Sequence, residues 1–173
     1  DSQDESLDYL KRLRWIRLIE RRDRNNPGGG YAHAAGLDTG LANCNTEFFV
    51  SMHSDALVQK QNWLMDLVSY FGNDENIACV GSGKIELTPK WRALLKYATD
   101  FRTAARKLLR EPDPIGKFRY YNRTICCIYR TEVLRRENLS FLIYTDKGLT
   151  GGKKLYFELV NRGYKTVELA PSI

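Results

Sequence analysis

Two side chains that could bind a metal or a ligand stand at the end of an apolar run in the first third of the sequence. Residues 47–55 are rich in aromatic and aliphatic side chains and finish in His53, Ser54 and Asp55. Such a run indicates a buried strand at the centre of a sheet. Residues two apart on an extended chain point to the same side, and open α/β sheets bind ligands at the carboxyl ends of their strands. His53 and Asp55 therefore indicate a half-site for a divalent metal, or for a sugar hydroxyl and a phosphate; a plain polar strand end is the alternative.

The composition is that of an ordinary globular protein. The chain has 173 residues, of which 43% are hydrophobic and 28% charged, so a single domain over residues 1–173 with a sizeable core is expected. No apolar run approaches the roughly 20 residues that span a bilayer, and no signal peptide opens the chain. The cysteines lack metal-ligand spacing and are expected to be reduced core residues: Cys44, Cys79, Cys126 and Cys127. We therefore expect a cytoplasmic protein, peripheral to the inner membrane face at most.

The positive charge restricts the partners without choosing one. A net charge of +6 and a sequence pI near 9.2 suit an anionic ligand, an anionic membrane face or nucleic acid. No nucleic-acid module and no interleaving of aromatic with basic residues is present, so nucleic acid is not expected. A helix that begins at Pro89 carries an apolar stripe and many Lys and Arg residues. Its basic face is either solvated or in contact with an anionic membrane or partner.

Helical and extended patterns alternate along the chain. Helices are predicted at residues 1–12, 31–44, 61–71, from Pro89 onwards, 130–137 and 153–162, and strands at residues 15–19, 47–55, 77–86, 124–129 and 164–169. This alternation predicts an α/β fold with a mostly parallel sheet and crossover helices. The breaker at residues 27–30 precedes a helix containing Gly36 and Gly40, each of which costs about 1 kcal/mol of helical propensity. These glycines indicate close approach of the sheet or of a ligand phosphate.

The order and spacing of these features resemble the family-2 glycosyltransferases of the GT-A fold. The resemblance runs along essentially the whole chain. It rests on the Ser-x-Asp-x-Ser turn at residues 2–6, the glycine turn at 27–30, the Asn-x-Gly slot at 38–41, the Asp-x-Asp slot at 53–55, and the later landmarks Trp63-Leu64, Val80-Gly81, Tyr129-Arg130 and Gly163-Tyr164. It implies a Rossmann-like three-layer sandwich, truncated at the N-terminus because the family's first strand and helix would precede residue 1.

The resemblance also implies an activity and a site. A sugar would move from a nucleotide-diphosphate donor to a hydroxyl of a glycan, lipid or other acceptor, with inversion and with help from Mn²⁺ or Mg²⁺. Asp55 would hold the metal, and His53 would contact the metal, the ribose or the phosphates. The other donor-binding positions it implies are Gly30, Asp38, Gly40 and Gly83.

One departure concerns the catalytic base. Inverting members carry an acidic pair where this chain has Gly151 and Gly152, followed by Lys153 and Lys154. Asp146, in the preceding loop, is then the candidate base, while the two lysines at the helix N-terminus would either hold diphosphate or lie on the surface. The alternative function is a truncated or degenerate GT-A domain that acts as a non-catalytic binding module. The sequence does not indicate the sugar, the nucleotide or the oligomeric state. His33, the other histidine of the sequence, is expected on a helix surface.

Overall fold

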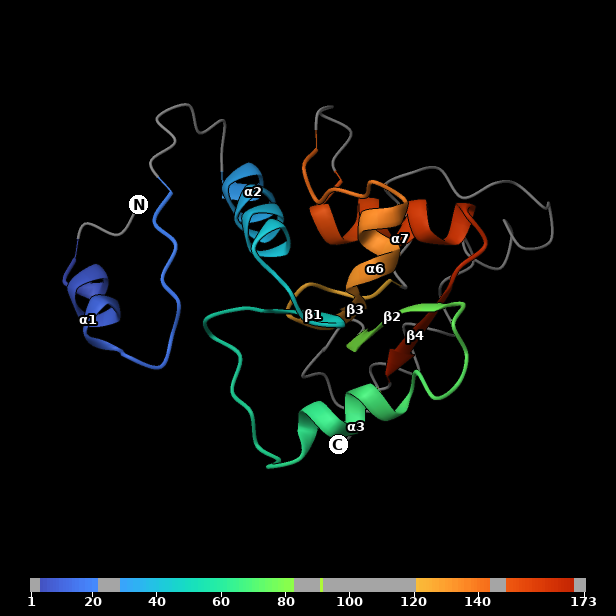
Figure 1. Cartoon of the computed structure of the whole chain (residues 1–173), viewed down its shortest axis with the longest axis horizontal. Coiled ribbons are helices and arrows are strands. Elements are labelled where there is room, and N and C mark those ends of the chain that lie inside the picture. The colour runs from blue at the N-terminus through green and yellow to red at the C-terminus, as the bar shows by residue number, and fades with distance from the viewer. Residues whose placement is uncertain (1–3, 22–28, 83–90, 92–120, 144–148, 170–173) are drawn as a thin grey trace.

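The computed structural model describes residues 4–21, 29–82, 91, 121–143 and 149–169. The predicted helix from Pro89, except Trp91, and the positions Gly83 and Asp146 lie outside these residues. Figure 1 shows the described helices and strands along the chain. Their bounds are α1 (Ser6–Arg12), α2 (Gly29–Ala42), β1 (Phe48–Met52), α3 (Trp63–Ser69), β2 (Ile77–Ser82), β3 (Cys126–Arg130), α6 (Thr131–Arg136), α7 (Gly151–Asn161) and β4 (Lys165–Leu169).

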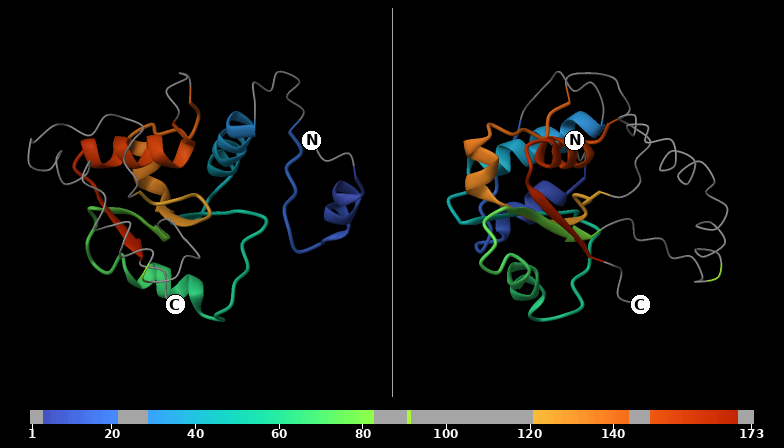
Figure 2. Two further views of the ribbon diagram at one scale, coloured as in Figure 1. Left: turned by 180° about the vertical axis from the view of Figure 1, so that it is seen from behind. Right: turned by 90° about the vertical axis from the view of Figure 1, so that its right-hand side faces the viewer.

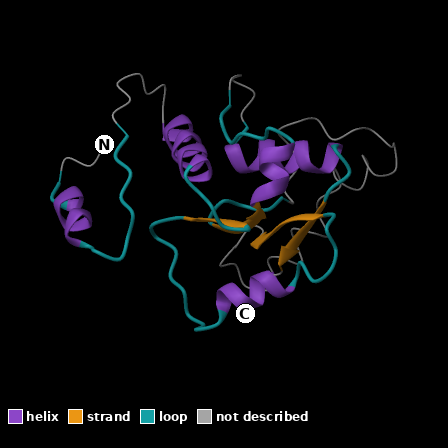
Figure 3. Ribbon diagram, in the orientation of Figure 1, coloured by secondary structure: helices purple, strands orange, loops and turns teal. Residues whose placement is uncertain are grey.

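The four strands form one mixed sheet in the order β1-β3-β2-β4, drawn in orange in Figure 3. β3 runs antiparallel to both β1 and β2, whereas β2 and β4 are parallel. β1, β2 and β4 therefore point the same way, and the predicted α/β class is confirmed. The prediction that β1 is the central strand is wrong for the described sheet, in which β1 lies at an edge. Phe49 is nevertheless buried, and Phe48 and Val50 are partly buried, because helices pack on both faces.

Two hydrophobic cores lie on opposite faces of the sheet. Helices α2, α6 and α7 cover one face and α3 covers the other, which gives three layers (Figure 1). Alternate residues of β1 divide between the cores: Phe49 packs on the α2 side and Phe48 on the α3 side. The larger core contains Tyr129, Phe141 and Leu155, all nearly or fully buried. This packing fixes the strand ends that carry the candidate site.

The predicted strand at residues 15–19 is absent. This segment forms a turn and a bend followed by irregular chain, and Trp15 is 81% exposed. Arg17 Nη2 donates a hydrogen bond to Asn43 Oδ1 at 3.0 Å. The segment is thus held beside the C-terminal end of α2 and does not join the sheet. α1 buries no residue and stands apart from the sheet in Figure 2. β-branched and aromatic residues form a strand where a neighbouring strand supplies hydrogen bonds, and none of the described strands pairs with this segment.

The cysteine prediction holds in part. All four cysteines are free, and Cys79 and Cys127 are buried, with their sulfur atoms 3.1 Å apart. Cys44 and Cys126 are only partly buried. Within the described residues, no helix has both the length and the apolar composition to cross a bilayer.

Candidate functional site

The carboxyl ends of β1, β2 and β4 and the amino end of β3 lie side by side along one edge of the sheet, the edge that the strand ends form. The segment just before β3 is held at this edge by its backbone. Ile125 accepts a hydrogen bond from the His53 N–H at 3.0 Å, and the Arg123 N–H donates to the Ser82 carbonyl at 2.9 Å. Residues that follow β1 therefore lie beside residues that precede β3, at the edge where open α/β sheets bind ligands.

Two imidazole rings and one hydroxyl meet at this edge. His53 Nε2 lies 3.5 Å from Thr124 Oγ1, and His33 Nε2 lies 3.1 Å from the same oxygen. The ring centroids are 4.9 Å apart, with the ring planes at 77°. Partial burial of the ring, followed by the nearby His53 ring, lowers the pKa of His33 below its ordinary value. The neutral form of His33 is therefore favoured near pH 7.

Asp55 joins the cluster from the other side of the His53 ring. Its Oδ1 lies 3.8 Å from His53 Nδ1, and its side chain is 88% exposed. The chain turns between them, because the Ala56 N–H donates to the His53 carbonyl at 3.1 Å. The structure therefore brings together the two residues singled out from the sequence and leaves the carboxylate open to a ligand.

The side chains of His53 and Asp55 suit a cation whose other coordination positions are filled by a bound molecule. Within the described ranges, no group of three or more His, Cys, Asp or Glu side chains is arranged to hold a metal ion. His53 and Asp55 alone would make an incomplete site. Small divalent cations are commonly bound by one or two protein groups together with substrate phosphates and water. These residues therefore suit a cation that arrives with, or is completed by, a diphosphate.

The predicted donor-binding glycines have different surroundings. A Cβ atom at Gly40 would lie 3.3 Å from the Phe49 ring, so this glycine lets α2 approach the sheet. A Cβ atom at Gly30 would meet nothing within 4 Å among the described residues. Gly30 lies in the first turn of α2, and its donor role stays a prediction. Gly83 lies outside the described residues.

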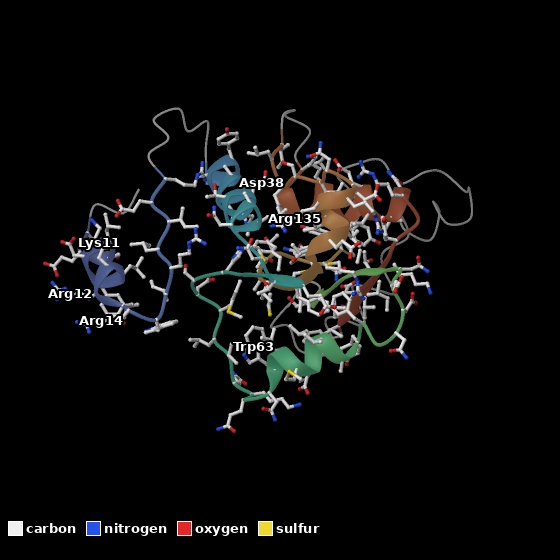
Figure 4. All side chains as sticks on the ribbon, in the orientation of Figure 1. Lys11, Arg12, Arg14, Asp38, Trp63 and Arg135 are labelled. Carbon is white, nitrogen blue, oxygen red and sulfur yellow. The ribbon has the colours of Figure 1, made fainter. Side chains whose placement is uncertain are left out.

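Asp38 positions a loop. Figure 4 shows it on the side of α2 that faces α6 and α7. Its Oδ2 accepts a hydrogen bond from Ser140 Oγ at 2.6 Å and one from the Leu142 N–H at 3.3 Å, and its Oδ1 accepts one from the Phe141 N–H at 2.8 Å. Both carboxylate oxygens are thus used within the protein. This geometry supports a structural role for Asp38, and its predicted contact with the donor gains no support from it.

Asp38→Ala is expected to destabilise the protein by about 2 kcal/mol, because three donors of the loop lose a partly buried charged acceptor. Urea denaturation measures the change in the free energy of unfolding. Thr39→Ala on the same helix is the control, since its hydroxyl only bonds back to Ala35 within α2. Equal stability of the two variants would contradict the assigned role.

The amino end of α7 is closely packed. Thr150 Oγ1 caps it by accepting a hydrogen bond from the Lys153 N–H at 3.4 Å. A Cβ atom at Gly151 would lie 2.7 Å from the Phe141 carbonyl oxygen, and one at Gly152 would lie 2.9 Å from Thr124 Cγ2. Glycine is therefore required here so that α7 can approach the segment before β3 and the loop after α6.

The two lysines at the start of α7 are both drawn into the protein. Lys154 Nζ donates hydrogen bonds to the carbonyls of Ser140 and Leu142, at 3.0 and 2.8 Å. The Lys153 side chain is buried, with its Nζ 5.6 Å from the centroid of the Tyr121 ring. Lys154 thus fixes the same loop as Asp38, and the surface placement considered for these lysines is wrong for Lys153.

His33 and Thr124 are site residues that the sequence analysis missed. His33 is exposed on α2, as expected, but its contacts place it beside His53. One signal was available. A helix that leads directly into a strand usually runs back along the sheet, so residues near the start of α2 lie near the carboxyl end of β1. Thr124 gave no signal, because a single hydroxyl before a strand has no distinctive pattern.

Comparison with known proteins identifies the family. Residues 1–129, about three quarters of the chain, match the family model described as glycosyl transferase family 2. The chain belongs to glycosyl transferase family 2. The resemblance noted from the sequence motifs is thereby confirmed. No curated protein sequence matches this chain.

A solved structure confirms the GT-A fold of this family-2 chain. The mannosyltransferase PcManGT from Pyrobaculum calidifontis, in complex with GDP-Man and Mn²⁺, matches it with a TM-score of 0.59 and 17% sequence identity. The match covers 98% of this chain and 43% of that protein. This chain thus spans less than half the length of PcManGT.

Proposed function

We propose that this chain forms the donor-binding part of a glycosyltransferase that moves a sugar from a nucleotide-diphosphate donor to an acceptor hydroxyl, with metal assistance and inversion. Membership of family 2 supports glycosyl transfer as the reaction class. The observation that carries the proposal for this chain is the cluster at the sheet edge. There His53 and Asp55 lie 3.8 Å apart, with Asp55 open to solvent.

The cluster suits the diphosphate end of a donor. A bound Mn²⁺ or Mg²⁺ ion would stabilise the negative charge that develops on the departing nucleoside diphosphate. Asp55 and His53 are the residues that would hold it. The complex of PcManGT with GDP-Man and Mn²⁺ supports a nucleotide-sugar donor that binds together with a metal. Thr124, whose hydroxyl is within hydrogen-bonding distance of both imidazoles, would orient the rings. Gly30, in the first turn of α2, would allow close approach of the backbone to the donor.

The catalytic base is proposed to be Asp146. The usual acidic position of the family is taken by Gly151 and Gly152, whose surroundings leave no space for a side chain. Asp146 precedes them in the sequence and lies outside the described residues. Its carboxylate would accept the proton of the acceptor hydroxyl during attack on the sugar. The acceptor is proposed to be a hydroxyl of a glycan, a lipid or another molecule.

A thermal-shift panel of nucleotide sugars tests the donor class. One nucleotide sugar is expected to raise the melting temperature in the presence of Mn²⁺ and to have little effect without it, because ligands that bind the native state stabilise it. The same nucleotide diphosphate without its sugar should give a partial shift. A panel with no metal-dependent shift would exclude donor binding by this chain.

A second candidate is a GT-A domain that binds a partner or glycan without catalysis. The packing of Gly151 and Gly152 favours it, because this chain has no room for the acidic pair of inverting members. This candidate predicts no sugar transfer and no donor hydrolysis, whether or not the chain binds the donor with its metal. Measurement of nucleoside diphosphate release with the donor found in the panel distinguishes the two candidates. Cytoplasmic location, and contact of the helix predicted from Pro89 with an anionic membrane, remain proposals.

A further inference from the structure

The sequence contains only two histidines, and the fold brings them together. His33 comes from α2 and His53 from the end of β1, yet their ring centroids are 4.9 Å apart. Both rings present the same atom, Nε2, to Thr124 Oγ1, at 3.1 and 3.5 Å. A ligand beside this hydroxyl would therefore meet two imidazole nitrogens, and Nδ1 of His53 would remain on the Asp55 side.

We propose that a transition-metal ion binds between Nε2 of His33 and Nε2 of His53. This inference rests on the proposed function and deepens it, because it names two imidazole nitrogens as ligands of the catalytic cation. His33 is a ligand that neither the sequence motifs nor the family match assigns. The remaining coordination positions are open to water or to diphosphate oxygens.

The arrangement around His53 supports this position for the ion. Histidine ligands usually direct their second ring nitrogen to a carboxylate, which fixes the ring and increases its basicity. Asp55 Oδ1 lies 3.8 Å from His53 Nδ1, on an exposed side chain. Asp55 then supports the His53 ring from its Nδ1 side, while Nε2 lies on the Thr124 side. In this arrangement His33 and His53 bind the ion and Asp55 orients His53, in place of the direct ligation by Asp55 proposed above.

The chemistry of the donors selects the metal. Imidazole nitrogen suits zinc, nickel and copper, whereas Mg²⁺ prefers oxygen ligands and retains its water. Two imidazoles therefore predict binding of Zn²⁺ and Ni²⁺, with Mn²⁺ weaker, in the absence of any donor. Mg²⁺ is predicted to bind only when diphosphate oxygens are supplied.

The histidine ring signals of the full chain provide the test, because NMR spectra of this protein contain ring signals from two histidines only. Zn²⁺ is titrated alone, without nucleotide sugar. The ring signals of His33 and His53 are expected to shift together along one binding curve. Mg²⁺ at the same concentrations should leave them unchanged. A response of His53 without His33 would overturn the proposal.

Two variants of His33 separate metal ligation from hydrogen bonding to Thr124. Calorimetric titration with Ni²⁺ and Zn²⁺ is expected to show at least a tenfold loss of affinity in both His33→Ala and His33→Gln. Glutamine can still hydrogen-bond to the Thr124 hydroxyl but lacks an imidazole nitrogen. Affinity within twofold of the native chain in His33→Gln would contradict ligation by His33. Because no donor is present, this result is independent of the donor-binding panel.

Discussion

Gly151→Ala is expected to destabilise the protein by about 1–3 kcal/mol, the usual cost of an added methyl group in a closely packed site. The new Cβ atom would lie 2.7 Å from the Phe141 carbonyl oxygen and 3.4 Å from Ala34 Cβ. The first neighbour is backbone, which Asp38 holds in place through the Phe141 N–H. Relief of the contact therefore requires α7 to move. Urea denaturation measures the loss.

Gly30→Ala is the matched control for this prediction. Gly30 is also in the first turn of a helix, but an added Cβ atom would meet none of the described residues within 4 Å. A glycine replaced by alanine without strain gains up to about 1 kcal/mol, because the unfolded chain loses conformational freedom. The two variants should thus change stability in opposite directions. Gly151→Ala at least as stable as the native chain would contradict the packing described for α7.

The packing of Gly151 and Gly152 also explains why the family's position for the catalytic base cannot be transferred to this chain. The resemblance places an acidic pair at Gly151 and Gly152. Here those positions form the contact between α7, Phe141 and Thr124. Thr124 also contacts both histidines, so this packing contact and the candidate site are adjoining. An acidic side chain introduced at this slot would displace the residues that position the imidazoles.

Much of the fold could be predicted from hydrophobic periodicity. The helical spacing at residues 31–44 and the apolar run at 47–55 correspond to α2 and β1, with shifted ends. The failures concern neighbours in space. Residues 15–19 have strand-forming side chains but no strand beside them among the described residues. β1 is apolar enough for a central strand yet lies at the edge of the described sheet, because helices on both faces also bury it.

Half of the candidate site could be predicted in the same way. The spacing of His53 and Asp55 was sufficient to expect the two side chains near each other, but the reason differs: β1 ends at Met52, and a turn closed by the Ala56 N–H brings them together. Asp38 was assigned to the donor from its slot in the motif, but its carboxylate binds the loop at residues 140–142. That contact joins residues about 100 positions apart in the sequence. No local pattern encodes it, and the same holds for the meeting of His33 with Thr124.

The affinity of Asp55→Ala for the nucleotide sugar in the presence of Mn²⁺ tests the central claim most directly. Loss of a metal ligand, or of the carboxylate that orients one, typically lowers metal affinity by 10- to 100-fold. Donor affinity is expected to fall by at least tenfold, with the melting temperature of the free protein unchanged because Asp55 is 88% exposed. Asp66→Ala on α3, which removes a carboxylate paired with Lys60, is the control and should retain donor affinity. Unchanged donor affinity in Asp55→Ala would contradict the assignment of the donor and metal site to the carboxyl end of β1.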